Sequence, residues 1–458
     1  MKRSWLWLVP LLLAAMVGGS FYFDRQAAKG DRELGVYVTG GQRMSAGEEI
    51  YRRGTDGKPF TYPPFAAVPF VGFSVLPDEW HAEAWFCVNF LILLGIVWWL
   101  HRWARSADTG RAPPRMWWFW IPTAVFGGRH IVSVFTNQSH DLTILGLVTL
   151  TAVSWCGRRQ VAGMLAGFWA GLGAATKATP LIFVGLFGLR LHWLGLLAIV
   201  ATTLGATLLP DYVFPRSQET IAAADQVFDP ERAGAGTWWR AWYDVNLAGL
   251  EVGGTADARG AWNSHSVLNQ SLSGALRRLF TPVEVPDGSF VVGDKGDVLL
   301  AELSTTMVRA VTLLASALVL GVISLGVWFA RGAVRAAGDA FAGVQRTVGL
   351  GEVAAFACGM VLLSPQSSKS HFCVWILPVA FVVNHLVRTR RDWLAILLFV
   401  AALALGLTSK GLLGKASANV VLAYGSVAGS TLLLLLATVR CLQQSRITSP
   451  SSAPPLAG

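Results

Sequence analysis

A series of long apolar runs restricts the fold of this 458-residue chain more than any other feature. A helix needs about 20 mainly apolar residues to cross a bilayer, and only a helix satisfies its own backbone groups there without closing into a barrel. Only 14% of the residues are charged and the mean hydropathy is +0.49, whereas soluble domains carry about 25% charged residues. The candidate runs lie near residues 4–23, 83–100, 116–135, 141–156, 161–176, 179–189, 193–210, 304–329, 348–364, 372–387, 393–408 and 419–439.

These runs predict an all-α polytopic membrane protein with about 12 transmembrane helices. Residues 1–445 form one membrane domain, and residues 446–458, rich in Ser, Pro and Ala, are predicted to be a disordered tail. Short runs such as 179–189 are expected to be broken or re-entrant helices buried in protein.

The first run allows two interpretations. Met1-Lys2-Arg3 followed by apolar residues and the small residues 17–20 fits a cleavable signal peptide. The run stays apolar as far as Phe23, beyond that cleavage position. We therefore favour a retained first helix.

The basic residues orient the predicted helices. One set of alternate connections is rich in Lys and Arg and, by the positive-inside rule, is cytoplasmic. Both termini are then cytoplasmic in a multi-pass protein of the cell (inner) membrane, and the tail 446–458 is cytoplasmic too. The outer face receives the loops 24–62 and 211–302 and the turns 136–141, 364–371 and 409–418. The cytoplasmic set comprises Lys2, Arg3, Arg102, Arg105, Arg111, Arg115, Arg158, Arg159, Arg190, Arg331, Arg335, Arg346, Arg388, Arg390, Arg391, Arg440 and Arg446.

Polar side chains that can act in catalysis or in binding gather on the predicted outer face. The first outer loop holds the carboxylates Asp31 and Glu33, and a carboxylate can accept a proton from a hydroxyl. Later turns hold Lys177, Lys369 and His371, which can bind a phosphate and stabilise its charge. The second outer loop contains aromatic side chains that can cover a sugar ring: Trp238, Trp239, Trp242 and Tyr243. Such groups are the parts needed to move a sugar from a lipid phosphate to a hydroxyl.

The segment Glu33–Met44 places Leu34, Tyr37 or Val38, and Met44 at roughly helical spacing. We expect it to form a helix lying along the membrane interface. Pro63 and Pro64 then impose an extended entry into the next apolar segment.

Other function classes lack support in the sequence. The net charge of +10 comes from residues between apolar runs and is no nucleic-acid signature. The five cysteines are scattered, so neither a disulfide framework nor a metal site is implied. No glycine-rich loop for a nucleotide phosphate precedes a strand and helix. No cofactor is expected, and a divalent metal is an alternative for which the sequence gives no support.

Several segments, in order and spacing, resemble the polyprenyl-phosphate-dependent glycosyltransferases of family 87, within the GT-C superfamily. The resemblance covers about residues 30 to 385, and each motif is weak by itself while the ordered set is fairly specific. The segments are Glu33-Leu34-Gly35-Val36-Tyr37, Gly47-Glu48-Glu49-Ile50-Tyr51, Phe60-Thr61-Tyr62-Pro63-Pro64, Asn137-Gln138-Ser139, Ala174-Ala175-Thr176-Lys177-Ala178-Thr179-Pro180, Asn269-Gln270-Ser271-Leu272 and Leu363-Ser364-Pro365 with His371.

This resemblance implies a GT-C-like bundle that transfers a hexose, often mannose, from a polyprenyl phosphate to a lipid or glycan hydroxyl, with inversion at the outer face. An acid of the first outer loop acts as base, and we favour Glu33 over Asp31, although the family usually has Asp at the position of Glu33. The family often has paired histidines where this chain has His371 alone. Lys177, Lys369 and His371 are the candidates for the donor phosphate, and the candidates for substrate binding are Tyr37, Tyr62, Asn137, Gln138, Asn269 and Gln270.

Two other classes remain open: a polytopic transporter or lipid-linked-glycan flippase, and a non-catalytic membrane scaffold. A transporter holds its polar groups near the midplane between repeats, whereas a transferase gathers them in one outer cavity. The location of the polar cluster distinguishes these classes.

Overall fold

The computed structural model describes positions 18, 19, 22 and 25 and residues 33–51, 60–106, 115–157, 160–216, 236–248, 265–282, 298–337, 341–389, 392–408 and 410–447. Throughout these residues the secondary structure is helical, with no strand. The longer helices are α2 (Glu33–Ala46), α4 (His81–Ser106), α5 (Met116–Asn137), α6 (Asp141–Trp155), α7 (Gln160–Thr176), α9 (Trp193–Val213), α13 (Thr305–Ala336), α14 (Phe341–Leu362), α15 (Ile376–Thr389), α16 (Trp393–Gly406) and α19 (Ser426–Ile447). The shorter ones are η1 (Pro64–Ala67), α3 (Val68–Phe73), η2 (Asp78–Trp80), η3 (Thr179–Phe183), α8 (Val184–Leu189), α11 (Trp238–Asn246), α12 (Leu272–Phe280), η6 (His371–Trp375), α17 (Lys410–Leu413) and α18 (Lys415–Ala423).

The all-α polytopic membrane architecture predicted from the apolar runs is confirmed. Five helical segments of the described chain are long and apolar enough to cross a membrane, and shorter apolar helices pack with them. The run 179–189 is two short pieces, η3 and α8, with Pro180 in the first turn. The first run and the tail beyond residue 447 lie outside the described residues, so the expectations of a retained first helix and a disordered tail are not tested.

The last apolar run differs from the expectation. Residues 419–439 were expected to form one helix, but the chain ends α18 at Ala423 and starts α19 at Ser426. Gly425 separates the two helices with φ +77°, a left-handed conformation that glycine adopts without steric cost. The composition of the run is apolar on both sides, which is why hydropathy did not mark this break.

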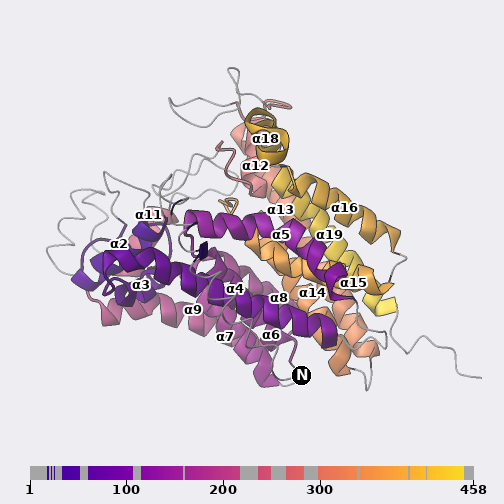
Figure 1. The fold of residues 1–458 in the computed structure, drawn as a ribbon, viewed down its shortest axis with the longest axis horizontal. Helices are drawn as coiled ribbons and strands as arrows, with labels where there is room; N and C mark the ends of the chain where they lie inside the picture. The colour runs from indigo at the N-terminus through magenta and orange to yellow at the C-terminus, as the bar shows by residue number, and fades with distance from the viewer. Residues whose placement is uncertain are drawn as a thin grey trace, which may run out of the picture.

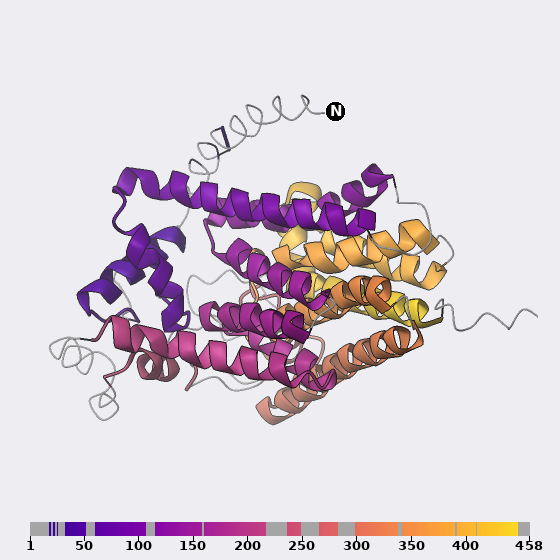
Figure 2. The same ribbon diagram turned by 90° about the horizontal axis from the view of Figure 1, so that it is seen from below.

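The helices lie side by side and share one apolar core, which runs from α4 to α19 (Figures 1 and 2). Successive helices run in alternate directions, so their connections gather at two ends. At one end Trp103 Nε1 donates to the carbonyl of Arg346, Arg388 donates to Ala104, and Arg331 donates to Leu189. The arginine-rich connections of the sequence therefore meet one another at a single end of the bundle.

A second apolar cluster covers the other end. It joins α2, α3 and α11 with Trp85 at the start of α4, and these elements lie together in Figure 1 beside α4 and α9. Close contact between α2 and α3 depends on Gly41, where a Cβ would lie 2.4 Å from the carbonyl carbon of Phe70. The expected helix over Glu33–Met44 is confirmed as α2, which buries Leu34, Tyr37, Val38 and Met44. The cluster fixes α2 over the helix ends that carry the polar turns.

Candidate active site

The tight turn between α5 and α6 places an acidic side chain at the covered end of the bundle. Gln138 ends α5 in the left-handed region with φ 52°. The amide of Gln138 bonds to Phe135 and that of Ser139 to Val134, the paired bonds with which a chain leaves a helix. The chain reverses there, and Asp141 begins α6, where a carboxylate is favoured by the helix dipole.

Asp141 forms a buried ion pair with Lys177. The Nζ of Lys177 donates to Oδ1 of Asp141 at 2.6 Å, and both side chains are largely buried. Lys177 directly follows α7, and Pro180 prevents that helix from continuing into η3. The hydroxyl of Ser139 donates to the other carboxylate oxygen at 2.9 Å. Asp141 therefore fixes the ammonium of Lys177 at the end of α7.

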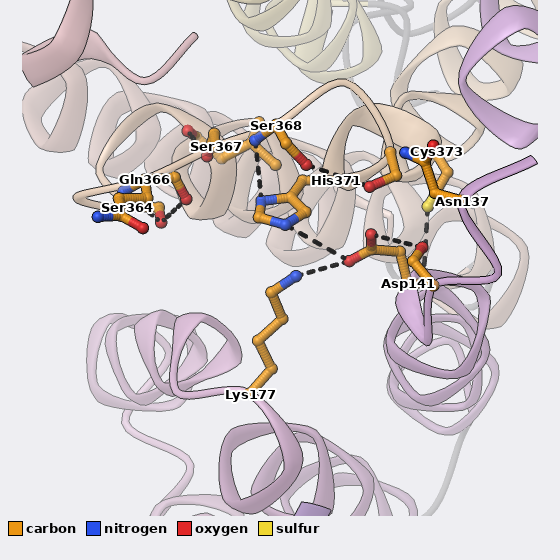
Figure 3. A network of polar contacts seen from close by, with 12 residues as sticks. Asn137, Asp141, Lys177, Ser364, Gln366, Ser367, Ser368, His371 and Cys373 are labelled. Carbon is orange, nitrogen blue, oxygen red and sulfur yellow. Dashed lines mark hydrogen bonds and ion pairs between the residues drawn. The ribbon is translucent and has the colours of Figure 1, made fainter. Parts of the chain in front are cut away.

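His371 approaches the same carboxylate from a third element. Its Nε2 lies 3.9 Å from Oδ1 of Asp141, and its Nδ1 accepts from the amide of Ser368 at 3.2 Å. That backbone bond assigns the proton to Nε2, which points toward Asp141 and Lys177. Figure 3 shows Lys177, Asp141 and His371 converging from α7, α6 and the segment before α15. A buried ammonium beside an imidazole donor is suited to an anionic group such as a phosphate.

Helix α2 brings a second carboxylate to this group. The hydroxyl of Tyr37 donates to Oε2 of Glu33 at 2.8 Å, and the Tyr37 and Tyr62 hydroxyls are 3.5 Å apart. Burial, followed by the charge of Glu33, raises the pKa of Tyr37 well above its usual range, so its hydroxyl stays protonated. Lys177 Nζ lies 5.8 Å from the ring centre of Tyr62. A continuous set of contacts thus joins Glu33 to the Lys177–Asp141 pair.

His140 occupies the middle of this set. Its ring meets those of Tyr37 and Tyr62 edge to face, with centroid distances of 4.9 and 4.3 Å. We call Glu33, Tyr37, Tyr62, His140, Asp141, Lys177 and His371 the outer-end cluster, after the face on which the sequence predicts them.

In the described residues, no group of three or more His, Cys, Asp or Glu side chains could hold a metal ion.

The remaining candidate residues lie around the cluster. Asn269 bonds through its amide group to the backbone of Pro365, Ser271 and Ser367, and Gln270 bonds to Val267, Leu422 and Val427. The Asn269 bonds hold the loop before His371, and the Gln270 bonds hold its own segment against the junction of α18 and α19. Their contact with substrate stays a prediction.

Three further candidates, Lys369, Asn137 and Asp31, are not among the residues of the outer-end cluster. The Lys369 side chain is exposed, whereas Lys177 is buried against Asp141. The amide of Asn137 lies 3.5 Å from Ser133 within α5, which is a weak contact at best. Asp31 lies outside the described residues. The roles assigned to these three residues stay predictions.

The aromatic residues of the second outer loop separate into two kinds. Trp238 is fully buried and donates to the carbonyl of Phe214, and Trp242 donates to Thr61, next to Tyr62. Trp239 and Tyr243 are exposed. Two of the four residues therefore secure α11, and a contact of the exposed pair with a sugar stays a prediction.

Two residues of the outer-end cluster, Asp141 and His140, were given no role in the sequence analysis. An acidic residue at the start of an apolar helix is costly near a membrane and marks a functional candidate, so the signal was present. Its partnership with Lys177, 36 positions away, becomes visible only in the fold.

Comparison with known proteins identifies the family of this chain. The family model described as Glycosyltransferase family 87 matches residues 60–365. A polyprenol-phosphate-mannose-dependent alpha-(1-2)-phosphatidylinositol mannoside mannosyltransferase of Mycolicibacterium smegmatis is 27% identical over 385 residues, covering 81% of this chain and 74% of that protein. No solved structure matches the chain. With a family match over more than half its length, the chain belongs to glycosyltransferase family 87 and is a multi-pass membrane glycosyltransferase.

Proposed function

We propose that this enzyme moves a mannose-like hexose from a polyprenyl phosphate to a hydroxyl of a lipid or glycan, with inversion, at the extracytoplasmic face. The supporting observation is the outer-end cluster, in which a half-buried carboxylate, Glu33, is linked through Tyr37, Tyr62 and His140 to the buried pair Lys177–Asp141. A base and a phosphate site on two sides of one group of aromatic rings are the arrangement that hexosyl transfer requires.

In the proposed reaction Glu33 removes the proton from the acceptor hydroxyl, and Asp31 is the alternative base. The acceptor oxygen then forms a bond to the anomeric carbon while the bond from that carbon to the phosphate oxygen breaks. A single displacement inverts the anomeric centre. The polyprenyl phosphate leaves as an anion, so it needs no proton, and Lys177 and His371 stabilise its charge.

Asp141 is a positioning residue in this scheme. Its strong contact with Lys177 makes it a poor proton acceptor, because an adjacent cation stabilises the charged carboxylate. Glu33 is instead held by a neutral tyrosine hydroxyl at the start of α2. The two carboxylates therefore take different roles.

The name of the mycobacterial relative supports the choice of donor, since that protein depends on polyprenol-phosphate mannose. Purified protein incubated with a panel of polyprenyl-phosphate hexoses and membrane glycolipids tests the proposal. We expect one hexose of added mass on a glycolipid by mass spectrometry, with the anomeric configuration opposite to that of the donor. Absence of transfer from every polyprenyl-phosphate hexose would contradict the proposed function.

The orientation can be tested with a matched pair of cysteines. Ser417 of α18 and Ser106 at the end of α4 are both exposed and lie in connections assigned to opposite faces. In a chain whose half-buried Cys87 is replaced by Ser, a membrane-impermeant maleimide added to intact cells should label Ser417→Cys and spare Ser106→Cys until the cells are opened. The reverse pattern would place the outer-end cluster in the cytoplasm.

A further inference from the structure

Two buried side chains in the outer-end region keep polar atoms without a hydrogen-bond partner among the described residues. They are both ring nitrogens of His140 and the Oε1 of Gln138, in side chains that are 3% and 6% exposed. Leaving a buried donor or acceptor unpaired costs about 1–3 kcal/mol, so such groups in a folded protein call for an explanation. Gln138 also holds a left-handed backbone conformation, and residues held in sparsely populated conformations cluster at functional sites.

The position of His140 identifies what it can bind. If Glu33 activates the acceptor and Lys177 holds the donor phosphate, the hexose must lie between these two residues. Its anomeric carbon is bonded to the phosphate and is attacked by the acceptor hydroxyl. The residues that join Glu33 to Lys177 are Tyr37, Tyr62 and His140. The Tyr37 hydroxyl already donates to Glu33, whereas both nitrogens of His140 are available.

The chemistry of the ring fits a sugar. Burial, together with the charge of Lys177, lowers the pKa of His140 to about 3, so the imidazole is neutral and offers one donor and one acceptor. A hydroxyl also both donates and accepts. The rings of Tyr37 and Tyr62 cover the imidazole, but their hydroxyls meet only at 3.5 Å, and Tyr62 is half-buried. Rotation of Tyr62 toward solvent would expose the ring, and it would break that weak contact together with the contacts of the Tyr62 ring with His140 and Lys177.

We infer that His140 and Gln138 form a subsite for the hydroxyl groups of the donor hexose, with His140 making the direct contact that distinguishes a hexose carrying a given hydroxyl from one that lacks it. This inference rests on the proposed transfer from a polyprenyl phosphate. It adds a residue that selects the sugar. That residue, His140, packs against Tyr37 and Tyr62, which lie between the candidate base and the candidate phosphate ligands.

The test combines a substitution with a set of altered donors. Values of kcat/KM are measured for polyprenyl-phosphate mannose and its 2-, 3-, 4- and 6-deoxy analogues, with the unmodified protein and with His140→Phe, which keeps a ring against Tyr37 and Tyr62 but lacks both nitrogens. We expect His140→Phe to lose about 10- to 100-fold with the mannosyl donor. With one particular deoxy donor the variant and the unmodified protein should be equally active, because the contact is already missing.

Two controls make the result decisive. His101→Phe is the matched substitution at the far end of the bundle, where His101 accepts from Trp120, and it should leave the whole donor profile unchanged. Gln138→Met repeats the test if His140→Phe does not fold, and it too should show a smaller loss with one deoxy donor than with mannose. Equal losses for all five donors in the folded variants would overturn the subsite while leaving the transferase function standing. If the unmodified protein transfers a hexose from no polyprenyl-phosphate donor of the panel, both the subsite and the proposed function are overturned.

Discussion

Replacing Glu33 by glutamine should lower turnover by about 10²–10⁴-fold, the contribution of a positioned general base. Glutamine keeps the length of the side chain and an oxygen to which Tyr37 can donate, as it does to Glu33 at 2.8 Å. What is lost is the ability to take a proton from the acceptor. The loss should therefore appear in kcat, measured with radiolabelled donor, while donor binding and expression are retained.

Asp31→Asn is the matched control two positions away. We expect it to retain activity, since Glu33 is the residue that contacts Tyr37 in the outer-end cluster. An active Glu33→Gln combined with an inactive Asp31→Asn would move the role of base to Asp31. Near-normal turnover in both single variants and in the double variant would remove the first outer loop from the chemistry.

Replacing Lys177 by methionine should lower kcat/KM by about 10²–10³-fold, the typical loss when one group that stabilises developing charge is removed. Methionine preserves much of the side-chain volume but leaves no ammonium for the departing phosphate. It also leaves Asp141 as a buried charge without its 2.6 Å partner, and breaking a buried pair costs about 3–5 kcal/mol of stability. Activity and thermal unfolding are therefore measured together.

The double variant Lys177→Met with Asp141→Asn separates the two effects. Neutralising Asp141 removes the uncompensated charge, so the midpoint of thermal unfolding should return toward that of the unmodified protein while transfer stays low. Lys369→Ala is the exposed counterpart, for which we expect a smaller loss than for Lys177 because its side chain is not buried against the cluster. Recovery of full activity in the double variant would show that Lys177 serves stability alone.

The sequence predicted individual residues of the site better than their relationships. Glu33, Tyr37, Tyr62, Lys177 and His371 all belong to the outer-end cluster. The sequence singled them out as ionisable residues of predicted outer turns or as residues of the family motifs, and their roles stay predictions. Lys369 was grouped with His371 because the two are neighbours in the chain, yet Lys369 lies in the turn before η6 and its side chain is exposed. Proximity in sequence within an irregular loop does not determine which side chains point inward.

Hydropathy by itself determined that this chain is a helical multi-pass membrane protein. Lipid offers no hydrogen-bond partner to the backbone, so an apolar run that crosses the bilayer must pair its own N–H and C=O groups, as a helix does. Tertiary structure decided what the polar residues do. The ion pair of Asp141 with Lys177 joins two helices, and the backbone bonds of Asn269 join two loops almost a hundred residues apart in sequence. Such contacts depend on which helices pack against one another. The apolar surface of one helix can pack against many others, so its local sequence does not determine the partner. The same packing placed His140 against two tyrosines, with no hydrogen-bond partner for its ring nitrogens among the described residues. The sequence around His140 does not predict this environment.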